Sequence, residues 1–410
     1  MSVDVRTRVD GREKAVDAAQ FFASVLPTSF SSFSDILSPA ALWLSPKPLA
    51  VSVESETWIL DCSQGTPQVA KGAPDGIETV TLSAEQVNEL AIDQATPMGM
   101  FSSGKLKMKG DLATFQNWWL LIRCALDGVA PTLPGSVTFK DIDDEPLDLA
   151  TNFTLSDSPE EIQHFLQEAG FLHLRGVFSE DEMNAISQDM DRASEHYFPG
   201  DGNSWWATTR DGVDRLVRMQ KFDKESENVA RLLLDDRLKA VACLTGDGHH
   251  FSDADSNRIE ALFKPIGIVK GISDVPWHKD CSLGRHSYEC CSLTIGISVT
   301  GAGPTSGQLQ VLAGSHRAHI WPALLQPGLD LPELGLATET GDVTVHLSCT
   351  LHMAQPPIEK ERRVLYTGLR LPPLDAEATN AARLRLREVR EAASVSVSQP
   401  PSLVPAYSRT

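Results

Sequence analysis

The chain has 410 residues, more than one hydrophobic core usually organises, so we expect two domains. Hydrophobic residues make up 41% of the chain and charged residues 22%, as in soluble globular proteins. The net charge of −19 argues against a nucleic-acid partner and against electrostatic attachment to an anionic membrane, because both need clustered Lys and Arg.

The cysteines and the N-terminus predict a compartment. Seven cysteines follow no ligand or disulfide spacing, which is typical of free thiols in a reducing environment. Residues 1–14 are charged and lack the apolar stretch of a secretory signal. The chain contains no run of about 18 apolar residues, so the sequence predicts no membrane span. We therefore expect a cytoplasmic protein.

The first part of the chain alternates between short strands and amphipathic helices. Residues 57–61 and 79–82 have the composition of strands. Ser83 is followed by Gln86 three positions later, and this capping box predicts a helix that runs to about Ile92.

A cationic strand and a broadly apolar helix follow. Residues 104–110 alternate Lys with Leu and Met, as a half-buried strand does. Asp111 is placed to cap a helix to about Leu126, and Trp118 and Trp119 widen its apolar face. Such a face is typical of an ordinary core, and the alternative is the wall of an apolar cavity.

Residues 17–130 resemble the sterol carrier protein type-2 domain. The resemblance rests on the tryptophan strand, the Val-Thr-Leu-Ser step, Met-Gly-Met-Phe and Gly-Lys-Leu-Lys-Met-Lys-Gly-Asp, in that order. It implies an N-terminal α/β sandwich over residues 1–135, in which helices and a five-stranded sheet enclose a tunnel for sterols, fatty acids or acyl-CoA. Several such domains serve as dimerisation modules, so a homodimer is a second implication.

A linker comes next, followed by a segment with clear helix start and stop residues. Pro and Gly break the pattern before residues 136–153, which we expect to be the linker. Ser158 precedes a proline and predicts a helix that Gly170 ends, and Ser179 predicts the cap of the next helix. This order of helix, Gly-Phe strand and Val-Phe-Ser-x-x-Glu resembles the opening of the phytanoyl-CoA dioxygenase family.

Two adjacent tryptophans, Trp205 and Trp206, follow this opening. They predict either packing at a domain edge or a lid over a bound substrate. Arg210, Arg215 and Arg218 lie close behind them and are the nearest cations for a substrate carboxylate or phosphate. Such arginines are more often solvated surface charges.

The most informative short motif contains His278 and Asp280. Side chains two positions apart in a strand face the same side, so an imidazole nitrogen and a carboxylate oxygen can reach one metal ion. His352, far downstream, could complete two histidines and one carboxylate, the ligand set of non-haem iron(II) oxygenases. His346 shares strand parity with His352 and is the competing ligand.

From about residue 261 the chain reads as short strands broken by Gly and Pro. This pattern predicts a jelly-roll barrel, or double-stranded β-helix, with flanking helices. Residues 307–317 resemble the Gly-x-Leu-x-Val-x-x-Gly-Ser-His-Arg strand and turn of the phytanoyl-CoA dioxygenase family. Within this segment, His316 is expected to be a structural turn residue.

The resemblance to that family covers about residues 154–373. It implies a dioxygenase that depends on Fe(II), 2-oxoglutarate and O2 and hydroxylates an aliphatic C–H bond. It also implies that His278, Asp280 and His352 bind the metal and are catalytic. A carboxylate at position 280 speaks against a halogenase, in which a small apolar residue replaces it.

The same resemblance assigns the co-substrate contacts. Arg363 lies 11 residues after His352, and this is the spacing at which the family places the arginine that binds 2-oxoglutarate. Arg362 is the alternative, because neighbours on a strand face opposite sides. Lys264 resembles a position near the co-substrate. Ala354 stands where the family often has a Ser or Thr that bonds the co-substrate, so these contacts depart from the pattern.

Residues 374–410 predict a helix followed by a loosely ordered tail. The two resemblances together predict an α+β protein of two domains that hydroxylates a lipid-like, acyl or natural-product substrate, with the N-terminal domain binding its apolar part. The alternatives are a lipid carrier with a non-catalytic barrel, and a family member that catalyses desaturation or epoxidation.

Overall fold

The fold was analysed in a computed structural model. The residues that the structure describes are 16–72, 75–92, 95–102, 104–245, 248–251, 258–271, 273, 277–280, 292–318 and 329–370. The tail predicted over residues 374–410 lies outside this part of the chain. The four described cysteines are free, as expected from their spacing. Among the described helices, none combines the length and the apolar character needed to cross a membrane.

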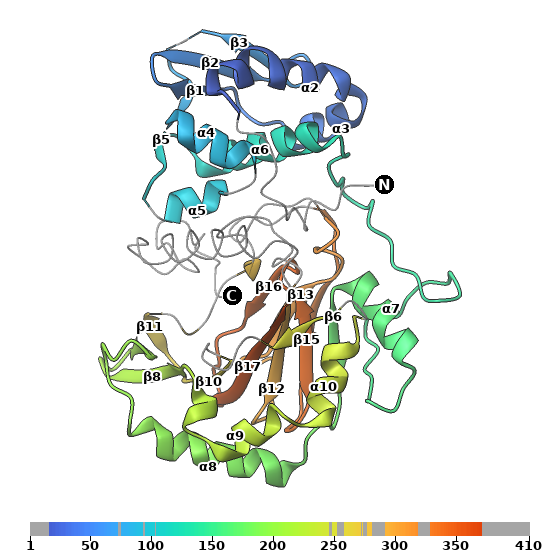
Figure 1. The fold of residues 1–410 in the computed structure, drawn as a ribbon, viewed down its shortest axis with the longest axis vertical. Coiled ribbons are helices and arrows are strands. Elements are labelled where there is room, and N and C mark those ends of the chain that lie inside the picture. The colour runs from blue at the N-terminus through green and yellow to red at the C-terminus, as the bar shows by residue number, and fades with distance from the viewer. Residues whose placement is uncertain are drawn as a thin grey trace.

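The N-terminal unit, α1 to α6, packs helices against a five-stranded sheet (Figure 1). The sheet order is β3-β2-β1-β4-β5, with β1 and β4 parallel and the other pairs antiparallel. Its strands are β1 (Leu49–Val53), β2 (Glu56–Asp61), β3 (Gln68–Lys71), β4 (Glu78–Leu82) and β5 (Lys107–Lys109). Its helices are α1 (Ala18–Gln20), the π-helix η2 (Phe21–Val25), α2 (Leu26–Ser32), α3 (Ser34–Leu44), α4 (Ala84–Ala91), α5 (Pro97–Ser102) and α6 (Leu112–Asp127).

Two helix starts in this unit form as their sequences predict. Ser83 and Gln86 make a reciprocal capping box at α4, and Asp111 accepts the Ala113 N–H at the start of α6. The tryptophans of α6 lie in the core, because Trp118 is 0% and Trp119 1% exposed. The broad apolar face of α6 is therefore core packing.

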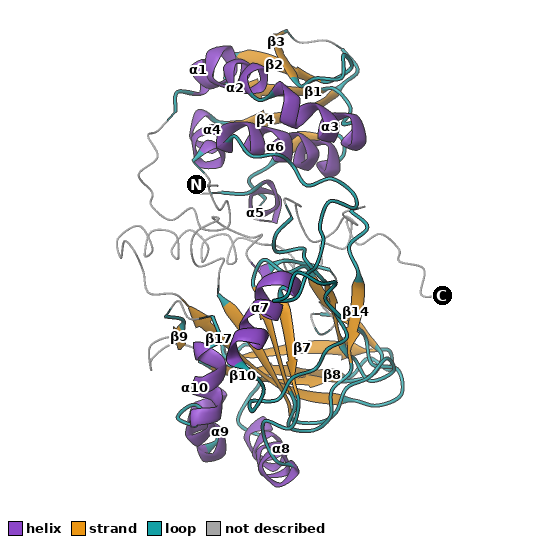
Figure 2. Ribbon diagram, turned by 90° about the vertical axis from the view of Figure 1, so that its right-hand side faces the viewer, coloured by secondary structure: helices purple, strands orange, loops and turns teal. Residues whose placement is uncertain are grey.

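The C-terminal unit, α7 to β17, contains two sheets that share one hydrophobic core (Figure 2). The large sheet has the order β11-β7-β8-β10-β17-β12-β15-β6, with β9 paired to β17, and the small sheet has the order β14-β13-β16. The strands are β6 (Phe171–Leu174), β7 (Ser204–Thr209), β8 (Asp214–Met219), β9 (His250–Phe251), β10 (Ile259–Lys264), β11 (Ile268–Lys270), β12 (Leu293–Ser298), β13 (Leu309–Leu312), β14 (Glu333–Leu336), β15 (Val343–Leu347), β16 (His352–Ala354) and β17 (Arg362–Arg370). This is the double-stranded β-helix expected from the sequence, and the whole protein is of the α+β class.

Helices cover the outer face of the large sheet, and their apolar residues join its core. Ser158 and Ser179 cap two of these helices as predicted, and Gly170 ends the first with φ of 84°. The helices are α7 (Pro159–Ala169), α8 (Glu180–Ser194), the 3-10 helix η3 (Phe222–Lys224), α9 (Glu227–Leu232) and α10 (Asp236–Cys243).

One glycine in the barrel is required by close packing. Gly341, just before β15, has φ of 87°, and a Cβ atom there would lie 1.9 Å from the carbonyl oxygen of Phe178. The Gly341 carbonyl also accepts the Phe178 N–H at 3.0 Å. This contact ties the start of β15 to the turn before α8.

The two units meet at a small apolar cluster. Trp43, in α3, packs against a buried group that includes Leu312 and Leu351. Trp277 joins the same cluster. Since Trp277 and Leu351 each precede a predicted metal ligand in the chain, the N-terminal unit contacts the segments that carry the site.

Candidate metal centre

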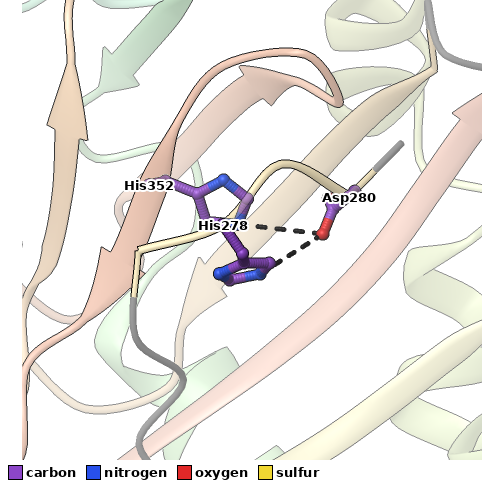
Figure 3. Close-up of side chains that lie close together, drawn as sticks. All are labelled: His278, Asp280 and His352. Carbon is purple, nitrogen blue, oxygen red and sulfur yellow. Dashed lines mark ion pairs between the residues drawn. The ribbon is translucent and has the colours of Figure 1, made fainter. Parts of the chain in front are cut away.

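The three predicted ligands lie close together (Figure 3), and backbone hydrogen bonds hold the segments that carry them. His278 and His352 form an antiparallel bridge in which each N–H donates to the other's carbonyl, at 2.9 and 3.0 Å. The Asp280 N–H donates to the Ser348 carbonyl at 3.0 Å. The segment 278–280 is thus fixed beside β16, although it lies more than 70 residues earlier in the chain.

The side chains of these residues converge. Oδ1 of Asp280 lies 3.5 Å from His278 Nε2 and 3.8 Å from His352 Nε2. One ligand atom from each residue can be chosen so that all three lie within 4.8 Å of one another. Ligands about 2.1 Å from an ion and at right angles to each other are roughly 3 Å apart. A small inward adjustment would therefore let the three atoms hold a single ion.

Hydrogen bonding prepares these atoms as ligands. His352 Nδ1 donates to the Thr350 carbonyl at 2.9 Å, which leaves Nε2 with a free lone pair. Thr294 donates to Asp280 Oδ2 at 3.0 Å and leaves Oδ1 facing the histidines. These are the second contacts by which proteins orient metal-binding side chains.

The protonation states also suit a cation. Burial, and then His278 and His346, hold the pKa of His352 well below its usual value, so its imidazole is neutral near pH 7. Burial alone would raise the pKa of Asp280, but His352, His278 and His346 together hold it well below its usual value. Two imidazoles and one carboxylate form a donor set that fits iron(II).

A pocket of about 200 Å³ opens beside the three ligands. Asp280, whose side chain is 37% exposed, is the most open of the three. The pocket runs between the large and small sheets. It is lined by Arg218, Glu260, Leu262, Lys264, His278, Asp280, Thr294, Leu309, His346, His352, Ala354 and Tyr366.

Comparison with known proteins identifies both halves of the chain. Residues 166–364 match the phytanoyl-CoA dioxygenase (PhyH) family, and residues 37–122 match the SCP-2 sterol transfer family. The chain contains an SCP-2 domain followed by a PhyH domain. The two families, and the order in which they occur, confirm what the sequence motifs predict.

Several solved structures are similar to part of the chain, all at low identity. EctD from S. alaskensis with 2-oxoglutarate and 5-hydroxyectoine is 19% identical over 59% of this chain and 82% of that chain, with a TM-score of 0.43. The epimerase SnoN in complex with Fe3+, alpha ketoglutarate and nogalamycin RO is 18% identical over 54% and 88%, with a TM-score of 0.40. EvdMO1 is 21% identical over 52% of this chain and 50% of that chain, so only half of its length is spanned, with a TM-score of 0.41. No curated protein sequence gave a match.

Strand register decides which arginine faces the pocket of the PhyH domain. Lys264 lines the pocket, is 2% exposed and is paired across β10 and β17 with Arg362. Arg362 alternates with Tyr366, which also lines the pocket, so both lie on the inner face of β17. The Arg362 Nη1 donates to the Gly307 carbonyl at 2.7 Å, and the residue is 2% exposed.

The structure directs Arg363 away from this pocket. Its guanidinium donates to the carbonyl and hydroxyl of Ser187 at 2.8 and 2.9 Å and pairs with Asp191 at 2.7 Å, both on α8. The family spacing of 11 residues therefore falls on a residue that faces α8 in this structure. The physical reason is the phase of β17, which turns Arg362, the residue before Arg363, inward.

Other predicted residues of the PhyH domain have distinct places. Arg218 lines the pocket, lies 4.1 Å from the ring of Trp205 and pairs with Glu260 at 3.2 Å. Trp206 donates to the Ser204 hydroxyl. His316 is buried and its Nε2 lies 2.7 Å from the Gln167 carbonyl, as a structural turn residue would be.

The sequence motifs did not identify three polar residues that line the pocket: Glu260, Thr294 and Tyr366. The sequence could have indicated Glu260, because Glu260 and Lys264 are an even number of residues apart on β10 and so face the same side. For Thr294 and Tyr366, the pattern identifies the strand but does not say which face is inward.

Proposed function

We propose that the protein is an Fe(II)- and 2-oxoglutarate-dependent dioxygenase that hydroxylates an aliphatic C–H bond of a lipid-like, acyl or natural-product substrate. The observation that carries this proposal is the convergence of His278, Asp280 and His352 at one end of a pocket that also contains Lys264. The match to the phytanoyl-CoA dioxygenase family supports the same reaction class.

Each ligand has a defined part in the proposal. His278 and His352 would bind iron through Nε2, and Asp280 would bind it through Oδ1. When bound, the iron supplies the redox chemistry by which O2 oxidises both 2-oxoglutarate and the substrate. Thr350 and Thr294 hold His352 and Asp280 in orientation.

We assign the co-substrate contacts to two buried cations. Lys264 brings a positive charge into the pocket, and Arg362 lies directly opposite it on the next strand. A carboxylate of 2-oxoglutarate pairs favourably with such cations, and a guanidinium can do so through two hydrogen bonds. This assignment replaces Arg363, which is engaged with α8.

The SCP-2 domain is proposed to bind the apolar part of the substrate. Its family match supports a hydrophobic ligand. Trp43 of this domain packs next to the residues that precede His278 and His352. That contact supports a role for the two domains as one unit, and a homodimer stays a prediction.

A spectroscopic experiment tests the reaction class. Anaerobic protein with Fe(II) and 2-oxoglutarate should develop the weak visible charge-transfer band of the chelate, and O2 should then yield succinate. His278→Ala should lose both signals, because two protein ligands do not hold the ion as three do. His196→Gln is the matched control, since this histidine is 68% exposed, pairs with Glu225 and does not line the pocket.

The outcomes separate the proposal from its alternatives. No band at saturating Fe(II), together with a lipid that co-purifies in native mass spectrometry, would favour a carrier with a non-catalytic barrel. A product that gains one oxygen atom indicates hydroxylation or epoxidation, and a product that loses two hydrogens indicates desaturation. The same native spectra report whether the protein is a dimer.

A further inference from the structure

A third imidazole lies beside the three ligands and has no assigned role. His346, on β15, is 1% exposed and lines the pocket. Its ring centroid lies 4.2 Å from that of His352, and its Nε2 is 3.8 Å from Asp280 Oδ2. A distance of 3.8 Å is too long for a hydrogen bond. Within the described part of the chain, neither ring nitrogen of His346 has a hydrogen-bond partner.

Such a residue is costly to the folded protein. A buried polar atom that has lost water and gained no partner destabilises the fold, and native proteins keep few of them. Apolar side chains fill the outer face of β15, where Val343 and Val345 pack into the core. His346 alternates with these residues and points to the inner face. A leucine or phenylalanine there would fill space without unpaired nitrogens, so the imidazole implies a ligand.

The geometry argues against His346 as a fourth metal ligand. The group whose ligand atoms lie within 4.8 Å of one another contains His278, Asp280 and His352, and His346 is not among them. His346 instead approaches the Oδ2 side of Asp280, where Thr294 already donates. Its free nitrogens are therefore available to a molecule in the pocket rather than to the ion.

We propose that His346 donates a hydrogen bond to an oxygen of the keto-acid end of 2-oxoglutarate, where the co-substrate meets the metal. This inference rests on the proposed function. His346 lies at the metal end of the pocket, and Lys264 supplies the charge for the other carboxylate. Ala354 lines the same pocket and its methyl group cannot donate, so the donor must come from another strand. The N–H on the pocket-facing ring nitrogen of His346 is the donor.

Titration calorimetry on the full chain tests the proposal without turnover. The protein is loaded anaerobically with Mn(II), and 2-oxoglutarate is titrated into wild type, His346→Phe and His346→Gln. His346→Phe should weaken the binding of 2-oxoglutarate by about 10- to 100-fold, which is the effect of losing one hydrogen bond to a charged group. His346→Gln keeps a donor and should recover most of that loss. Mn(II) affinity should change by less than about threefold in either variant.

Stability gives a second readout that a structural role would not produce. Because phenylalanine removes two unpaired buried nitrogens, metal-free His346→Phe should melt at the same temperature as wild type or higher. If phenylalanine does not fit beside His352, His346→Leu is the apolar variant used for both measurements. Unchanged 2-oxoglutarate affinity in the apolar variant would overturn the inference, and so would a tenfold loss of Mn(II) affinity, which would make His346 a ligand. If wild type binds no 2-oxoglutarate, the proposed function fails and the inference fails with it.

Discussion

Lys264 and Arg362 are direct partners across the antiparallel strands β10 and β17, and each residue is only 2% exposed. The next pair in the same ladder, Phe263 and Arg363, faces the other way, and the Arg363 guanidinium lies over the Phe263 ring. A one-residue step along β17 therefore separates a cation inside the barrel from a cation that fastens α8 to its outside.

This separation predicts that two neighbouring substitutions will affect 2-oxoglutarate binding to very different extents. Arg362→Met should weaken 2-oxoglutarate binding by about 30-fold or more, because removing one partner of a buried charge pair costs at least 2 kcal/mol. Arg363→Met should change it by less than about fivefold, because its partner Asp191 is 62% exposed and such pairs contribute about 1 kcal/mol or less. Calorimetry on the anaerobic Mn(II) protein measures both, and the reverse order would restore Arg363 as the anchor.

The hydrogen bond from Thr294 to Asp280 should control metal affinity. Thr294→Val keeps the shape of the side chain and removes the donor to Oδ2. Loss of such outer contacts typically lowers metal affinity by about 10- to 100-fold. Competition with a chromophoric chelator measures the dissociation constant for Mn(II) or Co(II).

Thr344 provides the control for that substitution. It also lies in the large sheet and is 2% exposed, but its hydroxyl faces the Gly296 carbonyl at 3.5 Å and does not touch a ligand. Thr344→Val should leave the dissociation constant within about threefold of wild type. Equal losses in the two variants would mean that sheet packing, and not the bond to Asp280, sets the affinity.

The parts of this structure that the sequence predicts are those fixed by local chemistry. The capping boxes at Ser83 and Ser179 depend on residues three positions apart, and both form. The shared direction of His278 and Asp280 depends on a spacing of two, and a family pattern supplies the distant His352.

The parts that remained undecided depend on the phase of a strand after a loop. The seven residues between β16 and β17 can deliver either Arg362 or Arg363 to the pocket, and counting from His352 does not fix the choice. The parity of His346 and His352 is likewise uninformative, because both face inward and only the distances separate a ligand from its neighbour. Pocket residues such as Tyr366 needed the tertiary structure for the same reason.

A buried carboxylate should make the barrel sensitive to acid. Burial alone would raise the pKa of Asp342, but hydrogen bonds from His173 and from the N–H groups of Gly176 and Glu339 lower it below its usual value. The folded protein then binds fewer protons here than the unfolded chain. The stabilisation is complete above the unfolded pKa of about 3.9 and is lost as the pH falls through the lower folded value.

Asp342→Asn measures that contribution. At pH 7 it should lower the free energy of unfolding by about 1–3 kcal/mol, because three donors lose a charged acceptor. The difference from wild type should shrink as the pH falls below about 3.9 and through the lower folded pKa of Asp342, where the wild-type carboxylate becomes protonated as well. Urea unfolding followed by circular dichroism at several pH values gives both quantities. Asp236→Asn, with a side chain 96% exposed, is the control, and a gap that stays constant with pH would contradict the assignment.

The contact between the two domains should affect both stability and the metal site. Trp43 packs with Trp277 and Leu351, which directly precede His278 and His352. Trp43→Ala should cost about 1–3 kcal/mol of unfolding free energy, less than a fully buried tryptophan would. It should also raise the Mn(II) dissociation constant by up to about 10-fold, because the segments that carry the ligands lose support.

Leu42→Ala is the matched control for Trp43. It removes an apolar side chain one position earlier on the same helix, where the residue is 68% exposed. Its effects on stability and on Mn(II) affinity should be small, because an exposed leucine loses little contact when it is truncated. Thermal unfolding and chelator competition are run on both variants. If Trp43→Ala matches Leu42→Ala in both measurements, the two domains do not support each other through this cluster in solution.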